Sequence, residues 1–225
     1  MAEVPVIAVD GPSGSGKGTL AQDLARRLAW HYLDSGALYR IVALAALERS
    51  VELDAGAALA TLAGQLTISF SPDRLPPTVW LDGRDVTRDI RAEPVSVAAS
   101  RVAAHPELRS ALIATQRSFR RTPGLVADGR DMGTVVFPDA RLKIFLEASA
   151  EERAERRYKQ LKDKDLSVSL RALLASIRER DARDRERAAS PLVAAADAFV
   201  IDSTGLTIEG VQERAWQCVV AAGLV

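Results

Sequence analysis

The sequence has few of the residues that mark disulfide-bonded, zinc-binding or membrane-spanning proteins. Its single cysteine, Cys218, cannot form a disulfide within the chain. His105 lies at a predicted helix junction without a second histidine or cysteine nearby, so we expect no metal site there. No apolar stretch approaches the roughly 20 residues that cross a bilayer, and the N-terminus enters a strand pattern directly, without a leader pattern. We expect a cytoplasmic protein without a membrane partner.

The chain also lacks an excess of charge of either sign. Its 30 basic residues balance 30 acidic ones, so no overall field attracts nucleic acid, and we expect no nucleic-acid partner. Arginine supplies 25 of the 30 basic residues and suits bidentate phosphate recognition, although a GC-rich genome would also enrich it. With 225 residues, 48% of them hydrophobic, the chain can form one sizeable domain with a full core.

The stretch VPVIAVDGPSGSGKGT, from Val4 to Thr19, joins an apolar strand pattern to a helical pattern through a glycine-rich turn. The glycines allow backbone conformations that a Cβ would block, so successive N–H groups can point at phosphate oxygens. Lys17 adds a charge directed at the β- and γ-phosphates, and the next helix adds the positive end of its dipole. We interpret this stretch as a phosphate-binding loop, or P-loop.

The motif G-x-x-x-x-G-K-[ST] is complete from Gly11 to Lys17, but Gly18 occupies the hydroxyl position and Thr19 follows one place later. A GKGT ending resembles nucleoside-monophosphate kinases, whereas most GTPases carry the hydroxyl directly after the lysine. A flexible glycine turn before a helix is the simpler alternative. The strand before the turn and the helix after it favour a P-loop phosphotransferase.

Further strand patterns alternate with helical ones, which predicts an α/β fold with a five-stranded parallel sheet flanked by helices. One strand ends in Asp128, at the edge of the sheet near the P-loop, where a carboxylate could hold Mg²⁺ directly or through water. The five predicted strands are Val4–Asp10, Tyr32–Asp34, Leu125–Asp128, Leu142–Leu146 and Phe199–Asp202.

The segment HYLDSGALYR, residues 31–40, changes from a strand to a helix at Ser35. Ser35 could simply cap that helix. In P-loop kinases, however, this place carries the acceptor site, and Arg40 could reach an acceptor phosphate from the helix. Both interpretations stay open at this point.

A long insert, residues 37–121, separates the second and third core strands. Its proline-bounded short strands predict a small antiparallel sheet in which Trp80 packs locally. Ser100 and Arg109 lie on helical patterns, where a solvated face is the default interpretation. The predicted elements are helices at Leu38–Glu48 and Ala57–Leu66, strands at Leu66–Ser71 and Thr78–Asp82, and helices that begin at Glu93 and Pro106.

A charged region, residues 149–187, precedes the last core strand. Arg153, Arg156 and Arg157 share one helical face just before Lys159–Ser167, a polar stretch that suits a mobile lid. Three further residues are spaced i, i+4 and i+7 on the next helix, which would place them on one side of it: Arg180, Asp184 and Arg187. The final helix, Thr207–Ala222, carries Trp216 and Cys218, which we expect in the core.

Four segments, in order, resemble the bacterial cytidylate kinases: GPSGSGKGT, LDSGALYR, ADGRDMGTVVFP and RERDARDRERA. The resemblance covers essentially the whole chain. It implies a single P-loop kinase domain, 1–225, with its core at about 1–36, 122–148 and 188–225. It also implies an enlarged insert that binds the nucleoside monophosphate (NMP), at about 37–121, and a short lid region at about 149–187. The implied reaction converts ATP and CMP or dCMP to ADP and the diphosphate.

The same resemblance implies roles for individual residues. The ATP phosphates would contact Gly11, Pro12, Ser13, Gly14, Ser15, Gly16, Lys17, Gly18 and Thr19. The metal, Mg²⁺ with ATP, would lie near Thr19 and Asp128. The acceptor nucleotide would be surrounded by Ser35, Arg40, Ser100, Arg109, Arg130, Asp131, Arg180, Asp184 and Arg187. The catalytic set would be Lys17, Arg130, Arg187 and, from the lid, Arg153 and Arg157.

Within the acceptor set, Arg40, Arg130 and Arg187 are expected mainly at the phosphate. Arg180 and Asp184 are expected mainly at the pentose. Ser100, Arg109 and Asp131 are expected mainly at the base. We expect a monomer that uses ATP and CMP or dCMP as small-molecule partners.

Two alternatives remain from the sequence. One is a P-loop kinase for another small acceptor, such as UMP, AMP or shikimate. The other is a nucleotide-binding switch that works by binding a partner. The sequence lacks the N-K-x-D motif with which GTPases read their base, and a switch would leave the arginine-rich acceptor half without a purpose.

Overall fold

The computed structural model describes residues 3–71, 75–162 and 168–225. Its centre is a five-stranded sheet in the order β2-β6-β1-β7-β8, and every neighbouring pair is parallel. This confirms the predicted sheet and its five strands. Their bounds are β1 Val6–Asp10, β2 His31–Asp34, β6 Leu125–Gly129, β7 Leu142–Glu147 and β8 Phe199–Asp202.

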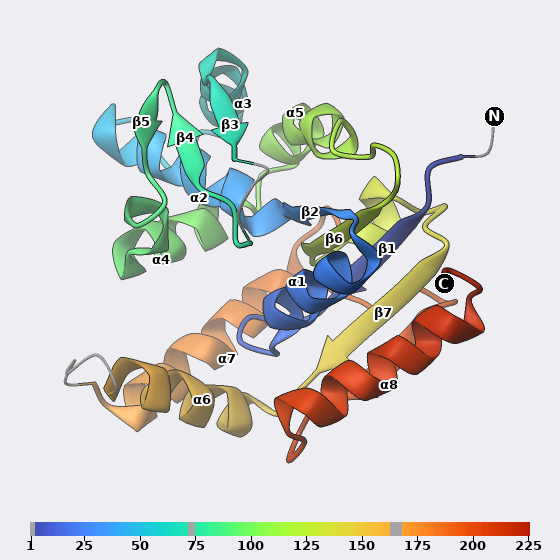
Figure 1. Ribbon diagram of the computed structural model, residues 1–225. Coiled ribbons are helices and arrows are strands. Elements are labelled where there is room, and N and C mark those ends of the chain that lie inside the picture. Colours follow the sequence, from blue (N-terminus) through green and yellow to red (C-terminus); the bar gives the residue numbers. More distant parts are fainter. Residues whose placement is uncertain (1–2, 72–74, 163–167) are drawn as a thin grey trace.

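Helices cover both faces of the sheet (Figure 1), as parallel strands with continuous apolar sequences require. On one face, α1 (Lys17–Leu28) and α8 (Ile208–Ala221) pack on alternate residues of β1, including Ile7 and Val9. On the other face, α2 (Ser35–Glu48) and the insert form a larger cluster that includes Val6 and Ala8. The alternation of β1 side chains between the two clusters follows from the period of two in a strand.

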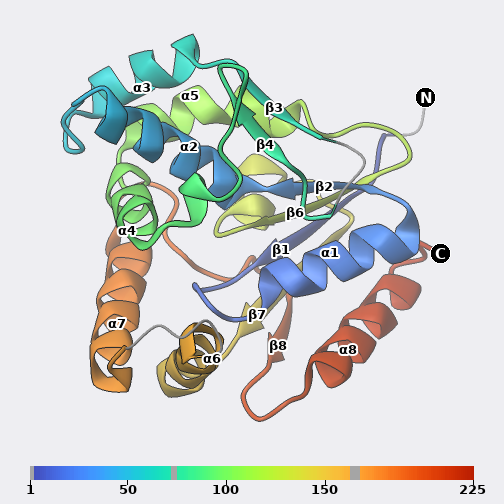
Figure 2. The same cartoon turned by 60° about the vertical axis from the view of Figure 1, so that its left-hand side comes forward.

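The insert forms a separate lobe above the edge of the sheet where β2 lies (Figures 1 and 2). The small antiparallel sheet is confirmed, and it gains a third strand, β5, after Gly83. Trp80 differs from the prediction. It is 40% exposed, because Val79 and Leu81 occupy the inner face of the same strand. The elements are α2 Ser35–Glu48, α3 Gly56–Gln65, β3 Ile68–Phe70, β4 Val79–Leu81, β5 Arg84–Asp85, η1 Asp89–Arg91, α4 Glu93–Val102 and α5 Pro106–Arg117.

The charged region forms two packed helices, α6 (Ala150–Lys162) and α7 (Leu170–Glu186), beside the P-loop. Of the predicted lid, Lys159–Ser167, the first four residues belong to α6, and residues 163–167 lie outside the described part of the chain. None of the helices in the described ranges is long and apolar enough to span a membrane.

The final helix was expected to bury Trp216 and Cys218, but both side chains are only partly buried at the border of the core. The guanidinium carbon of Arg27 lies 5.3 Å from the centre of the Trp216 ring. One part of the Trp216 ring therefore packs on the core, while the ring also interacts with the Arg27 cation. The helix periodicity gave the correct face but not the depth of burial.

Candidate active site

The P-loop connects β1 to α1 as the sequence predicts. Gly11 begins the turn, where a Cβ would lie 2.2 Å from the carbonyl oxygen of Leu146 on β7. Gly14 and Gly16 have φ angles of +79° and +93°, in the left-handed region that favours glycine. Gly16 is also the N-cap residue of α1, so the backbone N–H groups of the loop and helix end converge on one anion-binding position.

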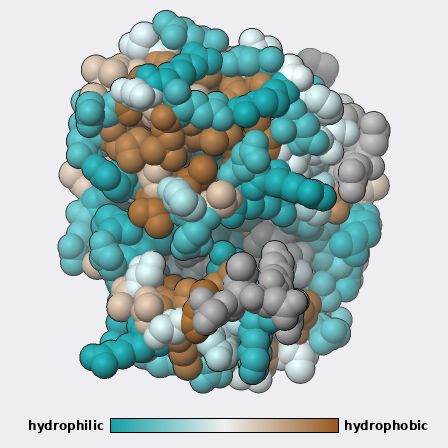
Figure 3. All heavy atoms as spheres, turned by 90° about the vertical axis from the view of Figure 1, so that its left-hand side faces the viewer, coloured by the Kyte–Doolittle hydropathy of each residue, from teal (hydrophilic) through white to brown (hydrophobic). Residues whose placement is uncertain are grey.

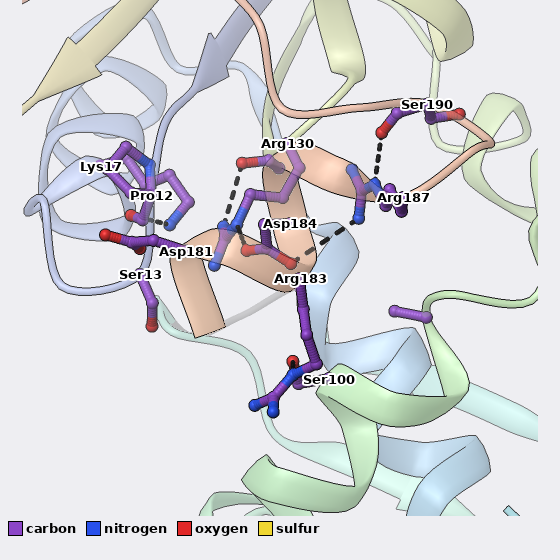
Figure 4. Close-up of polar contacts among 12 residues, drawn as sticks. Pro12, Ser13, Lys17, Ser100, Arg130, Asp181, Arg183, Asp184, Arg187 and Ser190 are labelled. Atoms are coloured by element: carbon purple, nitrogen blue, oxygen red, sulfur yellow. Dashed lines mark hydrogen bonds and ion pairs between the residues drawn. The ribbon is translucent and has the colours of Figure 1, made fainter. Parts of the chain in front are cut away.

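Lys17 is folded back onto this loop, and its Nζ donates a 3.1 Å hydrogen bond to the carbonyl oxygen of Pro12 (Figure 4). The side chain is buried. Burial, followed by repulsion from Arg130, lowers the pKa of Lys17 to about 7, although Asp128 acts in the opposite direction. A phosphate at this place would restore the charged form of the amine, because a neighbouring negative charge favours an ammonium.

Asp128 lies at the end of β6, next to the P-loop, as predicted. A Cβ on Gly18 would be 3.0 Å from Asp128 Oδ2, so the glycine at this motif position makes room for the carboxylate. Tyr32 donates a 3.3 Å hydrogen bond to the same oxygen. Burial raises the pKa of Asp128 to about 6, and Lys17 opposes this shift. Thr19, the second expected metal contact, is exposed on the first turn of α1.

Arg130 and Asp184 form the centre of the cluster of residues expected to bind the acceptor (Figure 4). Arg130 Nε donates a 2.9 Å hydrogen bond to Asp184 Oδ2, which joins the end of β6 to α7. Burial acts to raise the pKa of Asp184, but the surrounding arginines outweigh it and hold that pKa below its usual range. The carboxylate therefore stays ionised and fixes Arg130 in place.

Arg180 and Arg187 complete this cluster. Burial and repulsion from Arg130 lower the pKa of Arg180 to about 10. Arg187 lies just beyond the end of α7 in extended backbone, so the helical spacing predicted for it is wrong. Its guanidinium still lies 3.8 Å from Asp184, and its Nε donates to the carbonyl oxygen of Ser190.

Several arginine nitrogens in this region are buried without a hydrogen-bond acceptor in the described residues. Unpaired buried donors are unfavourable, and four of them beside a P-loop indicate a place for an anionic ligand. The atoms are Arg40 Nε, Arg109 Nε, Arg180 Nε and Arg187 Nη2.

Arg109 and Asp131, the residues expected at the base, form a buried ion pair. Arg109 also donates a 2.9 Å hydrogen bond to the carbonyl oxygen of Ala103 and lies 5.4 Å from the centre of the Tyr39 ring. Asp131 follows β6 and precedes a single π-helical turn, η2 (Met132–Val136). The default interpretation of Arg109 as a solvated helix residue is therefore wrong.

Ser35 and Arg40, the two N-terminal residues of the expected acceptor set, lie near the start of α2. Asp34, not Ser35, caps this helix, because its carboxylate accepts a 3.0 Å hydrogen bond from the N–H of Ala37. The same carboxylate pairs with Arg40 at 2.5 Å. Ser35 is buried. Since Asp34 does the capping, the simpler explanation of Ser35 does not apply.

Ser100 lies on α4 and accepts a 3.4 Å hydrogen bond from Arg183 Nε of α7 (Figure 4). Arg157, on α6, reaches the same helix, with its Nη2 3.2 Å from Glu93. These two contacts connect the insert with the α6–α7 pair. Figure 3 shows a surface hollow between these two parts of the molecule.

Arg153 does not extend toward this hollow as a lid residue would. It is 2% exposed and forms a two-point ion pair with Asp181 of α7. It also donates a 2.9 Å hydrogen bond to the carbonyl oxygen of Ser13 in the P-loop. Packing of α6 against both α7 and the P-loop decides this orientation, which helix periodicity alone could not show.

Sequence reasoning missed four residues in and around the site: Asp10, Asp181, Arg183 and Ser203. The carboxylate of Asp10 accepts hydrogen bonds from the N–H groups of Met132 and Gly133, at 2.9 and 2.8 Å. Burial raises the pKa of Asp10 to about 7, although these N–H groups oppose the shift. A charged residue that ends an otherwise apolar strand is the signal that could have identified Asp10.

Comparison with known proteins agrees with this geometry. The model of the cytidylate kinase family matches residues 7–220. The chain is 62% identical over 207 residues to a cytidylate kinase of Aeromonas salmonicida, which covers 92% of this chain and 90% of the relative. A cytidylate kinase of Klebsiella pneumoniae is 56% identical over 216 residues, 96% of this chain and 95% of the relative. The chain belongs to the cytidylate kinase family.

Proposed function

We propose that this protein transfers the γ-phosphoryl group of ATP to CMP or dCMP, giving ADP and CDP or dCDP. The observation that carries this proposal is a P-loop next to buried arginine donors that lack acceptors, in a chain of the cytidylate kinase family. Phosphoryl transfer needs in-line positioning and charge neutralisation rather than a covalent protein intermediate. Arginines, one lysine and a metal ion are chemically sufficient for it.

On the donor side, the residues from Gly11 to Thr19 would hold the ATP phosphates. Lys17 would leave the carbonyl oxygen of Pro12 and follow the transferred group. Breaking the contact with Pro12 should cost little free energy, because a single 3.1 Å hydrogen bond holds Lys17 Nζ in the free loop. Arg157 would leave Glu93 in the same way, since both side chains of that pair are largely solvated.

On the acceptor side, Arg40, Arg130 and Arg187 would bind the phosphate of the monophosphate. Arg180 and Asp184 would contact the pentose. Each of these arginines already has one protein partner or a fixed buried position, so little side-chain entropy remains to be lost on binding. Ser35, Ser100, Arg109 and Asp131 would complete the site around the nucleoside.

The residues present fit a magnesium ion with ATP. Asp128 offers a buried carboxylate beside Gly18, and oxygen ligands are those that Mg²⁺ prefers. Thr19 would add a hydroxyl from the first turn of α1. When bound, the ion would neutralise negative charge on the phosphate oxygens. The role of Asp128 is to stay ionised and face the phosphates, which Lys17 favours by opposing the rise in its pKa.

The test is the release of ADP measured with a series of acceptors. We expect kcat/KM for CMP and dCMP to exceed the values for UMP, AMP and shikimate by at least about tenfold, since one charged hydrogen bond to the base is worth about that much. Equal rates with UMP or AMP would replace the proposed substrate by the competing one. Binding of ATP with no acceptor-dependent turnover would instead favour a nucleotide switch.

We propose that a monomer is active. Specific activity that stays constant over a wide dilution series would agree with this. A fall in specific activity on dilution would indicate that an oligomer is required.

A further inference from the structure

We propose that Arg153 and Ser203, supported by Asp181 and Arg156, are positioning residues that set the orientation of two peptide groups in the P-loop. Both residues contact the loop, Arg153 from α6 and Ser203 from the end of β8. This inference rests on the proposed use of the loop for ATP. It adds residues to the donor half of the site that the motif does not contain.

The first contact holds the peptide group between Ser13 and Gly14. The carbonyl oxygen of Ser13 accepts a 2.9 Å hydrogen bond from Arg153 Nη1. In a trans peptide the carbonyl and the following N–H point in opposite directions. Because Arg153 holds the carbonyl toward α6, the N–H of Gly14 is directed away from α6.

The second contact holds the peptide group between Ser15 and Gly16 in the same sense. The hydroxyl of Ser203 has one proton, which it shares between the carbonyl oxygen of Glu147 at 2.9 Å and that of Ser15 at 3.3 Å. The N–H of Gly16 is thereby directed away from β8. Together the two contacts turn alternate N–H groups of the loop to one side, which is the arrangement that a phosphate requires.

Each contact is supported by a second residue. Arg153 is fixed by its two-point ion pair with Asp181, and its Nε donates a 3.0 Å hydrogen bond to the carbonyl oxygen of Ala148. Ser203 is fixed by Arg156, whose Nη2 donates to its carbonyl oxygen at 2.7 Å and whose Nη1 lies 3.2 Å from its hydroxyl.

These contacts matter for the loop because both donors are buried. Arg153 is 2% and Ser203 1% exposed, so water cannot replace either donor. Gly14 and Gly16 are flexible positions with positive φ, and without an external acceptor or donor their peptide groups could turn over. The helix that carries Arg157 thus also controls the shape of the ATP-binding loop.

The test uses the complete enzyme, and its main readout is ATP binding measured by calorimetry without an acceptor, which does not depend on the identity of the monophosphate. Ser203→Ala removes the hydroxyl, and Arg156→Met removes its support while keeping the side-chain stem. We expect each variant to raise the Kd for ATP by about three- to tenfold, as the loss of one net hydrogen bond does. The KM for CMP should stay within about twofold.

Non-additivity is a further readout. Since Arg156 acts through Ser203, the double variant should bind ATP no more weakly than the weaker-binding of the two single variants. The matched control is Arg178→Ala. Arg178 joins α7 to α6 through Glu151 at 2.5 Å, but contacts no residue of the P-loop. The control should leave the Kd for ATP unchanged.

Three results would overturn the proposal. Unchanged ATP affinity in both single variants would show that the Ser203 contact does not shape the loop. A parallel rise of the ATP Kd and the CMP KM would indicate a general loss of structure. Additive effects in the double variant would show that Arg156 and Ser203 act separately.

Discussion

Arg109 and Asp131 form an ion pair in which both side chains are about 95% buried, between the insert helix α5 and the end of β6. The pair joins two segments that are both expected at the base of the acceptor. One carboxylate oxygen of Asp131 bonds to Arg109, which leaves the other to accept a hydrogen bond from a ligand. The ion pair and base recognition are therefore compatible.

Asp131→Asn should reduce the preference for CMP over UMP. Cytosine presents an amino donor where uracil presents a carbonyl oxygen, and an ionised carboxylate accepts from the first and repels the second. A hydrogen bond to a charged group contributes about 1.5–3 kcal/mol, so the ratio of kcat/KM for the two substrates should fall by about ten- to a hundredfold. An equal fall for both substrates would mean that Asp131 supports the site without reading the base.

Lys17→Ala should fold normally and lose nearly all kinase activity. Lys17 lies at the junction of the loop and α1, and its 3.1 Å hydrogen bond to the carbonyl oxygen of Pro12 is internal to the loop. Thermal unfolding should show a Tm near that of the wild type. Turnover with ATP and CMP should fall by more than tenfold, because the positive charge that Lys17 places beside the transferred phosphoryl group is lost. A variant that keeps a tenth of wild-type turnover would contradict this role.

ATP binding should be linked to uptake of a proton at Lys17. In the free enzyme, burial and Arg130 lower the pKa of this amine to about 7. Phosphates raise it again, so ATP selects the protonated form and its affinity should decrease as pH rises above about 7. At pH 8, calorimetry of Mg-ATP binding in buffers of different ionisation enthalpy should show net proton uptake. The same uptake in Lys17→Met would assign the proton to another group.

Stability should also depend on pH through Asp10. Burial raises the pKa of this carboxyl from 3.8 to about 7, so the folded protein binds more protons than the unfolded chain between these values. The contribution of Asp10 to stability is thus fully present below pH 3.8 and is lost as pH rises through about 7. NMR titration of the Asp10 carboxyl should give a midpoint well above the ordinary value. A midpoint near the ordinary value would contradict the proposed burial effect.

The last residues of α6, Lys159–Lys162, should become more protected from hydrogen exchange when both nucleotides are present. They follow Arg157, which is paired with Glu93 in the free enzyme. Release of Arg157 to the phosphates would draw the end of this helix over the site, as lids that exclude water do. Equal protection with and without a two-substrate mimic would argue against a lid.

Much of the fold could be predicted because its signals are local. The apolar strand, the glycine turn and the helix at Val4–Thr19 lie within 16 consecutive residues, and each of them satisfies a physical requirement of a P-loop. The five strands of the parallel sheet were identified in the same way. The burial of the Trp80 and Trp216 side chains could not be predicted, because a periodic pattern indicates which face a residue occupies but not what covers it.

The sequence by itself determined the P-loop, the order of strands and helices, and the set of charged residues available for a phosphate site. Only the tertiary structure decided how those charges pair. The contacting residues are far apart in the sequence: 22 positions separate Arg109 from Asp131, 140 separate Arg153 from Ser13, and 188 separate Ser203 from Ser15. A local pattern cannot encode such contacts, because they depend on which strands become neighbours in the sheet and on how α6 and α7 pack beside the loop.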